Sequence, residues 1–375
     1  MYIPLDIEKL NSYSFEIGPI RPPSEGGSLS LLLRTTRNCS WSRCAFCYAS
    51  YTREKFQLRT VEEIREDIDT VKALSDEIGA IPWRIGSPEI QYPGTLKRIA
   101  ATIYNEVDGL MFRYNPSVRI VAGWLYAGSK TVFLQDNNSL IMRTPEQVEV
   151  IRYLKDTFPT IERVTSYARS KTVAKKSIDE LKELHDVGLS RLHIGLETGD
   201  DELLEYINKG VTAREHIEGG RKALEAGIEI SEYVMPGLGG RAMSEQHVVG
   251  TAMALNEIDP SFIRIRTFWP IPNTAMFEAW RRGEFQLLSP HECLREIGRL
   301  MERLDVTSRV CFDHDMNPQY KEDNRLIPLF KQDYDGYKFP DEKDEVLKLV
   351  EKGLTIDESC YISRASMINT LYFAR

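Results

Sequence analysis

The residues best suited to chemistry are three cysteines in one short run, CSWSRCAFC at positions 39–47, while the other cysteines are scattered. Three thiolates in one loop can hold three irons of a cubane cluster, and the fourth iron then lacks a protein ligand. Catalytic metal sites keep such an open position, which a small chelating ligand can fill. Cys39, Cys44 and Cys47 therefore predict a catalytic iron–sulfur site.

Two other interpretations of these cysteines remain open. A zinc site usually has four ligands with paired spacing, and the chain has no second C-x2-C run. Three inert, buried cysteines are the other alternative, but Arg37 and Arg43 flank the run and would favour thiolates. We therefore favour an iron–sulfur cluster.

Short strands and amphipathic helices alternate after residue 28. Runs rich in β-branched or aromatic residues predict six strands, over Leu31–Thr36, Thr131–Asp136, Arg163–Ala168, Arg191–Glu197, Glu229–Met235 and Phe262–Phe268. Capping-box patterns predict helix starts between them, at Thr60–Glu63, Thr144–Gln147, Ser177–Glu180 and Thr212–Glu215. Such alternation implies parallel strands with right-handed crossovers.

Six strand–helix units predict an α/β fold, an open, partial (β/α)6 TIM-like barrel of parallel strands. The chemistry of such folds lies at the carboxyl ends of the strands. The cysteines directly follow the first strand, so they fall at that end.

The barrel is predicted over residues 28–275, after an N-terminal extension at 1–27. An insert at about 79–130 contains a helical stretch from Thr95 and the apolar run VRIVAGWLYAG, and predicts either an extra strand with helices or a lid on the substrate side. Residues 276–375 predict a C-terminal α/β cap, with a helix after a Ser289–Glu292 capping box, a strand at RVCFDH and a charged helix near Asp341–Gly353.

The cysteine run resembles that of the radical S-adenosylmethionine (SAM) superfamily. The usual family motif is C-x3-C-x2-C after the first strand of a partial (β/α)6 barrel; here the first gap has four residues, and Phe46 matches the aromatic residue before the last cysteine. The resemblance covers roughly residues 28–270. It implies a 4Fe-4S cluster on the three cysteines, SAM chelating the open iron, and a reducing electron donor of the flavodoxin or ferredoxin type.

The resemblance also implies where SAM is held. Family members contact the SAM amino group after the second strand, where this chain has no G-G-E run but offers acceptors in Gln135, Asp136 and Asn137. After the third strand, Ser166 and Arg169 follow, and an arginine can pair with the SAM carboxylate in a bidentate way.

The fourth strand ends in GLETG at 195–199, followed by NKG at 208–210. This stretch resembles G-[LV]-[EQ]-S-G and N-R-G in radical SAM methylthiotransferases and anaerobic coproporphyrinogen oxidases. Glu197 would then accept from ribose hydroxyls or the ammonium, and Lys209 would stand where those relatives carry a carboxylate-binding arginine. The fifth strand runs into MPGLGG at 235–240, where Met235 and Gly237 would line the adenine.

Fewer residues suggest a role toward the substrate. Asp313 and His314 end the strand predicted in the tail and are candidates for the substrate side. His193 lies within a strand and is predicted to be a core histidine. No residue is assigned as an acid, base or nucleophile in catalysis.

Charge and composition limit the partners. A net charge of −8 and a pI near 5.5 argue against nucleic acid, which proteins bind by neutralising phosphates. No stretch approaches the roughly 20 apolar residues of a membrane span, and the N-terminus lacks an apolar signal core. We expect a cytoplasmic protein with a small-molecule substrate.

The resemblance implies reductive cleavage of SAM to methionine and a 5′-deoxyadenosyl radical, which abstracts hydrogen from the substrate. Cleavage of a different C–S bond, giving an aminocarboxypropyl group, is a second possibility. A non-catalytic iron–sulfur or zinc protein with a redox or regulatory role is the alternative from another class.

Overall fold

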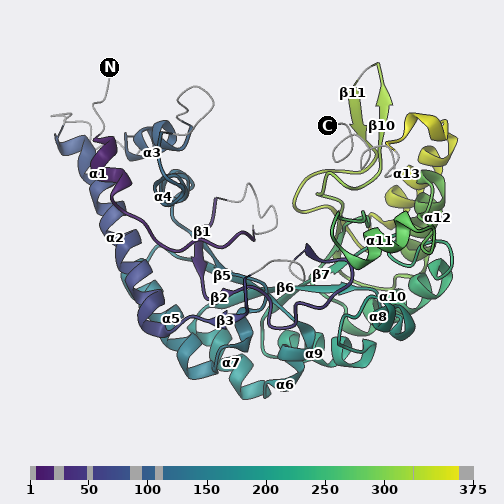
Figure 1. Ribbon diagram of the computed structural model, residues 1–375, viewed down its shortest axis with the longest axis horizontal. Helices are drawn as coiled ribbons and strands as arrows, with labels where there is room; N and C mark the ends of the chain where they lie inside the picture. The colour runs from purple at the N-terminus through teal and green to yellow at the C-terminus, as the bar shows by residue number, and fades with distance from the viewer. Residues whose placement is uncertain are drawn as a thin grey trace. The chain divides into compact units, whose positions relative to one another are not determined.

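The structure confirms the predicted alternation of strands and helices. It is a computed structural model that describes residues 6–20, 29–48, 54–84, 95–105, 113–323 and 325–362. All six predicted strands are present, as β1 (Leu31–Arg34), β4 (Thr131–Gln135), β5 (Arg163–Ala168), β6 (Leu189–Glu197), β7 (Glu229–Val234) and β8 (Phe262–Ile265). They belong to a mostly parallel sheet flanked by helices, so the α/β fold class is confirmed (Figure 1).

The chain divides into two compact units. The first comprises Met1–Asn38, Lys55–Tyr167 and Lys182–Arg191, and the second comprises Cys39–Glu54, Ala168–Leu181 and Leu192–Arg375. The predicted domain boundaries lay at residues 27 and 275. They differ from the bounds of the compact units and stay a prediction. No helix in the described part of the chain is long and apolar enough to cross a membrane.

In the first unit the strands follow the order β1-β4-β5, and the first residues of β6 come next. The register is parallel, with Leu31 opposite Val132 and Thr131 opposite Arg163. Buried apolar side chains such as Leu33 and Val132 make these strands nearly continuous hydrophobic runs, as expected for a sheet covered on both faces. A short antiparallel pair, β2 (Thr36–Arg37) and β3 (Gln57–Leu58), follows β1.

The helices of the first unit bury one apolar stripe each. On α2 (Val61–Arg84) that stripe is Ile64, Ile68, Val71, Leu74 and Ile78, all fully buried. The other helices are α1 (Ile7–Asn11), α3 (Thr95–Asn105), α4 (Pro116–Tyr126), the 3-10 helix η3 (Ser139–Ile141) and α5 (Thr144–Thr157). Within the predicted insert, VRIVAGWLYAG forms α4 rather than a strand, and the run at 85–94 lies outside the described residues.

In the second unit the sheet continues from the rest of β6 through β7, β8, β9 (Arg309–Cys311) and β12 (Tyr337–Lys338). The predicted tail strand β9 pairs with β8 in parallel, and β12 pairs with β9 in the antiparallel sense. The tail therefore extends the sheet instead of only capping it. A separate hairpin joins β10 (Gln319–Glu322) and β11 (Arg325–Pro328).

The remaining helices are α6 (Ser170–Lys175), α7 (Ile178–Val187), α8 (Asp201–Tyr206), α9 (Ala213–Glu225), α10 (Ser244–Ile258), α11 (Ala275–Arg281), α12 (Pro290–Arg303), α13 (Lys343–Thr355) and the 3-10 helix η4 (Glu358–Cys360). α12 packs against α13 and α10, and buries Leu294, Ile297 and Met301 in the core of the second unit (Figure 1). Burying one such side chain is worth about 1.5–3 kcal/mol.

Most of the predicted capping boxes are formed. The reciprocal bonds join Thr60 with Glu63, Ser177 with Glu180, Thr212 with Glu215 and Ser289 with Glu292. The box predicted at Thr144–Gln147 is wrong. α5 begins at Thr144 itself, with Arg143 as the N-cap and no side-chain cap bond, and neither polar side-chain atom of Gln147 has a hydrogen-bond partner among the described residues.

Candidate functional site

The cysteine run forms a loop in the second unit, and its backbone explains the four-residue gap. Cys39, Cys44 and Cys47 are partly buried thiols. Ser42 adopts a left-handed φ of 45° and its hydroxyl donates to the Cys39 carbonyl at 2.8 Å. The Trp41 amide donates to Cys39 Sγ at 3.4 Å. The additional residue is thus absorbed by a tight turn between the first two cysteines.

Two backbone hydrogen bonds fix this loop to neighbouring helices. The Ala45 amide donates to the Ile207 carbonyl at 2.8 Å, at the end of α8, and the Met276 amide of α11 donates to the Ala45 carbonyl at 3.0 Å. Phe46 packs beside the buried Phe268 and Met235. A loop held in this way is preorganised to present its thiols.

Trp41 is a site residue that the sequence analysis missed. Its indole N–H donates to the Asn208 carbonyl at 2.8 Å, and the guanidinium carbons of Arg43 and Arg169 lie 5.1 and 5.0 Å from its ring centroid. Gly210 provides the room, since a Cβ there would stand 2.3 Å from the Trp41 ring. The one sequence signal was the position of Trp41 inside the unusual four-residue gap.

Lys209 and Glu197 form an ion pair beside the cysteine loop. Lys209 Nζ lies 2.9 Å from Glu197 Oε1, and each side chain is 12% exposed. Gly195 makes space for them, because a Cβ there would meet Glu197 Oε1 at 2.1 Å and Lys209 Nζ at 2.9 Å. Glu197 has a φ of 62°, a conformation that non-glycine residues keep mainly at functional sites. Lys209 Nζ also lies 5.6 Å from the Phe46 ring centroid.

Two buried cations, Lys209 and Arg169, act on the Cys44 thiol against the effect of burial. Burial raises the pKa of the Cys44 thiol, while Lys209 and Arg169 act to lower it. Burial also works to lower the pKa of Lys209, but Glu197 and Cys44 raise it above its usual value, so the ammonium stays charged. Positive charge around thiols favours an anionic group such as an iron–sulfur cluster with three thiolate ligands.

Cations other than Arg37 and Arg43 act on the Cys44 thiol. Arg169 donates to the Lys209 carbonyl at 2.6 Å and joins the site, whereas Arg43 stacks on Trp41. Arg37 pairs with Glu16 and Glu63 in the first unit. An effect of Arg37 and Arg43 on the thiols stays a prediction.

Two further buried polar residues lie in the electrostatic reach of Lys209. Burial raises the pKa of Glu232 well above its usual value, although Lys209 and a backbone hydrogen bond from Leu196 act to lower it. Burial, with Lys209 and Arg169, holds the pKa of His216 well below its usual value. Both carry donors or acceptors that a polar ligand can use.

The predicted residues at the fifth strand are also close to Glu197. The Met235 amide donates to the Glu197 carbonyl at 3.1 Å, which joins the ends of β6 and β7. Gly237 has a φ of 84°, and its amide donates to Glu296 Oε1 at 2.5 Å. The second unit thus brings together the cysteine loop, Arg169, Glu197, Lys209 and Met235.

Four predicted SAM contacts lie in the first unit. The Gln135 amide accepts from the Gly18 amide at 3.0 Å and donates to the carbonyls of Gly18 and Ile20. Asp136 Oδ2 accepts two bonds of 2.8 Å from Arg34. The Ser166 hydroxyl bonds Ser139 Oγ at 2.7 Å. Asn137, which directly follows Asp136 in the sequence, is partly buried. Their contacts with SAM stay a prediction.

The tail strand β9 ends at Cys311, so Asp313 and His314 follow it instead of ending it as predicted, and their surroundings differ. Asp313 Oδ2 lies 2.5 Å from the guanidinium of Arg264, which is 1% exposed and also bonds Ser231. The Arg264 guanidinium lies 4.3 Å from the Tyr334 ring centroid. His314 Nδ1 accepts from the Met316 amide at 3.1 Å. His193 is fully buried beside the Tyr233 ring, as predicted for a core histidine.

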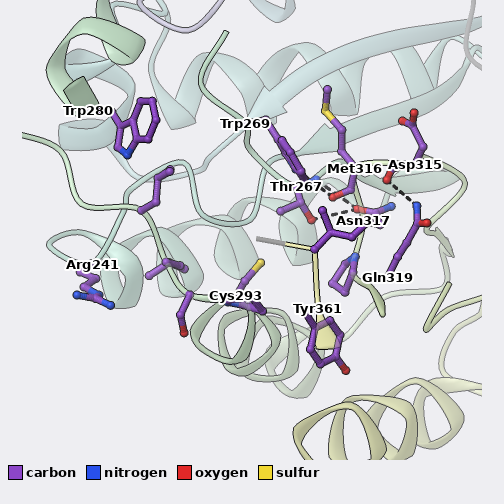
Figure 2. A pocket seen from close by; sticks show the side chains of 16 residues that line it. Arg241, Thr267, Trp269, Trp280, Cys293, Asp315, Met316, Asn317, Gln319 and Tyr361 are labelled. Carbon is purple, nitrogen blue, oxygen red and sulfur yellow. Dashed lines mark hydrogen bonds between the residues drawn. The ribbon is translucent and has the colours of Figure 1, made fainter. Parts of the chain in front are cut away.

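A cavity of about 340 Å³ opens in the second unit (Figure 2). Trp269, Trp280, Met316 and Tyr361 line it, with Arg241 among the polar lining residues. Most polar groups on its wall are engaged within the protein; Thr267, for example, bonds Asn317 Oδ1 at 3.2 Å. The wall is therefore mainly aromatic and apolar.

The arrangement of the thiols bears on the choice of metal. Within the described part of the chain, no three His, Cys, Asp or Glu side chains stand close enough to hold one metal ion. Zn–S bonds of about 2.3 Å would require thiolates within about 4 Å of one another. A cubane takes one thiolate at each of three irons, so its ligands stand farther apart. The fit of a cubane rests on the donor set, three thiols in one loop with Lys209 and Arg169 acting on Cys44.

Comparison with known proteins decides the family. Residues 33–251 match the sequence profile of the Radical SAM superfamily. The chain belongs to the radical SAM superfamily. Radical SAM proteins hold a 4Fe-4S cluster and SAM, and this chain is an enzyme of that type. The profile covers β1 to α10, including the cysteine loop, Glu197 and Lys209.

Similar radical SAM proteins match only parts of the chain. It is 25% identical over 135 residues to the tRNA uridine(34) acetyltransferase of Methanocaldococcus jannaschii, covering 35% of this chain and 25% of that protein. It is 23% identical over 160 residues to the heme chaperone HemW of Bacillus subtilis, covering 42% and 41%. The Elp3 structure of Methanocaldococcus infernus aligns with 65% of this chain and 60% of that one, at 18% identity and a TM-score of 0.44. The chain thus spans about a quarter of the length of its acetyltransferase relative.

Proposed function

We propose that this radical SAM protein binds SAM at a 4Fe-4S cluster held by Cys39, Cys44 and Cys47, and cleaves it reductively to start radical chemistry. The observation that carries the proposal is the convergence of the cysteine loop with Arg169, Glu197 and Lys209 in one unit. Buried side chains of opposite charge beside the three thiols suit a ligand that carries both an ammonium and a carboxylate.

The side chains have complementary tasks in this proposal. Arg169 and Lys209 are the cations for the SAM carboxylate, and Glu197 accepts from its ammonium or ribose hydroxyls. Phe46, Met235 and Gly237 offer an apolar face and an open backbone to the adenine. The remaining polar contacts proposed for SAM are Gln135, Asp136, Asn137 and Ser166.

When both groups are bound, the reduced cluster supplies the electron that breaks a C–S bond of SAM. Hydrogen bonds from Ala45 and Trp41 to the 207–208 backbone hold the loop in place. A flavodoxin or ferredoxin type of protein is the proposed electron donor. We also infer a reducing, cytoplasmic environment, because all six cysteines are thiols.

A small molecule is the substrate that we favour. The cavity of about 340 Å³ in the second unit lies within the size range of small-molecule sites, about 300–1,000 Å³, and has their mostly apolar lining. Trp269 follows β8 by four residues and faces this cavity (Figure 2). Substitution Trp269→Ala is expected to weaken substrate binding while cluster and SAM binding persist.

A tRNA substrate is the second candidate, because two relatives are named tRNA uridine(34) acetyltransferases. The net charge of −8 gives little general attraction for phosphates. Filter binding of a tRNA pool at low and physiological salt separates the two candidates. If the protein binds the tRNA pool saturably at physiological salt, RNA is favoured as the substrate. If tRNA binding seen at low salt is lost at physiological salt, a small-molecule substrate is favoured.

Product analysis tests the proposed reaction. Anaerobically reconstituted protein is incubated with SAM and dithionite, and the products are identified by mass spectrometry. 5′-Deoxyadenosine with methionine supports the usual cleavage, and methylthioadenosine indicates transfer or release of an aminocarboxypropyl group. Cys44→Ala should form neither product, whereas Cys360→Ala, outside the loop, should match the wild type. A wild type that holds the cluster and yields neither product would favour the non-catalytic alternative.

A further inference from the structure

Glu296 is an unexpected charge in the core of the second unit. It lies on α12 and is 1% exposed, among apolar neighbours such as Leu300 and Ile297. Its Oε1 accepts from the Gly237 amide at 2.5 Å, and its Oε2 accepts from the Ser244 hydroxyl. A buried carboxylate is costly unless it is fully hydrogen-bonded, so these two donors account for its tolerance.

His247 extends this contact toward the end of β6. Its Nδ1 lies 2.9 Å from the Thr198 hydroxyl, whereas its Nε2, 3.8 Å from Glu296 Oε1, is beyond hydrogen-bond distance and has no hydrogen-bond partner among the described residues. The ring is fully buried, and burial lowers the pKa of His247 although Glu296 and Asp200 act to raise it. A neutral imidazole therefore stands between the carboxylate of α12 and the residue next to Glu197.

These contacts reach both backbone segments that end at the proposed SAM site. Gly237 belongs to the 235–240 loop after β7, and Thr198 directly follows Glu197 after β6. The Met235 amide bonds the Glu197 carbonyl, so the two segments are themselves joined. Glu296 bonds the first segment directly, and His247, which bonds the second, lies beside it, although α12 is outside the 33–251 match.

We propose that Glu296 is a positioning residue for SAM: it anchors the Gly237 amide in the loop after β7, so that the part of the chain after β8 completes the SAM site. The inference rests on the proposed function. It departs from a purely structural role because an apolar residue on α12 would pack with Leu300 and Ile297 but would leave the Gly237 amide without an acceptor. Glu296 acts on the shape of the loop and needs no contact with SAM.

Three variants test the proposal. Glu296→Ala removes both acceptors, Glu296→Gln keeps an acceptor for Gly237, and Met301→Ala truncates a buried side chain elsewhere on α12. Two quantities are measured: hydrogen exchange of residues 235–240 in iron-free protein, and the SAM dissociation constant from the spectrum of the reconstituted cluster.

Glu296→Ala should exchange faster at 235–240 and bind SAM about tenfold or more weakly. Glu296→Gln should stay within about threefold of the wild type. Met301→Ala should lose resistance to urea but keep the wild-type SAM affinity. If Glu296→Ala does not fold, Glu296→Asp, whose carboxylate is one methylene shorter, should show the same changes in milder form.

If Glu296→Ala bound SAM as tightly as the wild type, or if Met301→Ala lost as much SAM affinity as Glu296→Ala, the inference would be overturned but the proposed function would stand. Wild-type protein that forms the cluster but does not bind SAM would overturn the proposed function, and the inference with it. Unchanged exchange at 235–240 in Glu296→Ala would show that the carboxylate does not anchor the loop. These three results are distinguishable from one another.

Discussion

Lys209 Nζ stands 2.9 Å from Glu197 Oε1 beside the cysteine loop, and both side chains are almost completely buried. Breaking such a pair leaves one charge in the interior. We expect Lys209→Met and Glu197→Gln each to lower the free energy of unfolding by about 3–5 kcal/mol. The double variant should lose clearly less than the sum, because neither charge is then stranded. Urea unfolding of iron-free protein measures the coupling, and strictly additive losses would refute it.

Gly210 tests the docking of Trp41. It has a φ of 68°, and an added Cβ would stand 2.3 Å from the indole. Gly210→Ala should displace Trp41, change its fluorescence and reduce the iron retained after reconstitution by about half or more, since the loop is no longer preorganised.

Gly283 provides the matched control for that substitution. Its φ is 75°, and among the described residues no atom lies within 4 Å of the position that a Cβ would take. Gly283→Ala carries the same left-handed strain, about 1 kcal/mol, without the clash. It should retain iron like the wild type. Equal iron loss in both variants would mean that backbone strain, and not Trp41, explains the effect.

Much of this architecture can be predicted from the sequence, and the elements that were not predicted have physical reasons. The six strands and most helix starts follow from local patterns, namely β-branched runs and hydroxyl–carboxylate boxes. The box at Thr144 failed because the Gln147 side chain makes no hydrogen bond back to the start of the helix, and Arg143 is the N-cap. The parallel pairing of β9 with β8 carries no local signal, because it depends on how α12 returns the chain to the sheet.

The site was harder to predict than the fold. The three cysteines were identifiable because their ligand chemistry lies within nine residues. The contacts of Trp41 with Asn208 and Arg169, and of Gln135 with Gly18, join residues more than 100 positions apart. A single sequence does not reveal such pairs. Glu296 and His247 were likewise hidden, because each lies in a helix whose pattern fits an ordinary apolar core.

Glu16 gives the first unit a pH-dependent stability. It accepts from Arg37 at 2.6 Å and from Arg34 at 2.9 Å. Its bond with Arg37, aided by Arg59 and Arg34, holds the pKa of Glu16 below its usual 4.5, although burial works to raise it. A carboxyl whose folded-state pKa is lowered stabilises the fold above its unfolded pKa, and that contribution is lost as the pH falls through the folded value.

Glu16→Gln should therefore lower the free energy of unfolding by about 1–3 kcal/mol at pH 7. The difference in the free energy of unfolding between Glu16→Gln and the wild type should shrink as the pH falls below 4.5. Urea unfolding at several pH values measures it. The control is Glu162→Gln, which removes an exposed pair with Lys130 and should change little at any pH. If the stability difference between Glu16→Gln and the wild type stayed constant with pH, ionised Glu16 would not be the source of the pH dependence.

The account depends most on SAM docking at the cluster that Cys39, Cys44 and Cys47 hold. The most direct measurement is electron paramagnetic resonance of the anaerobically reconstituted and reduced protein, titrated with SAM. We predict a 4Fe-4S signal that shifts saturably as SAM is added, and no such signal in Cys44→Ala. Wild-type protein without a cubane, or with a cubane whose signal is the same with and without SAM, would contradict the central claim.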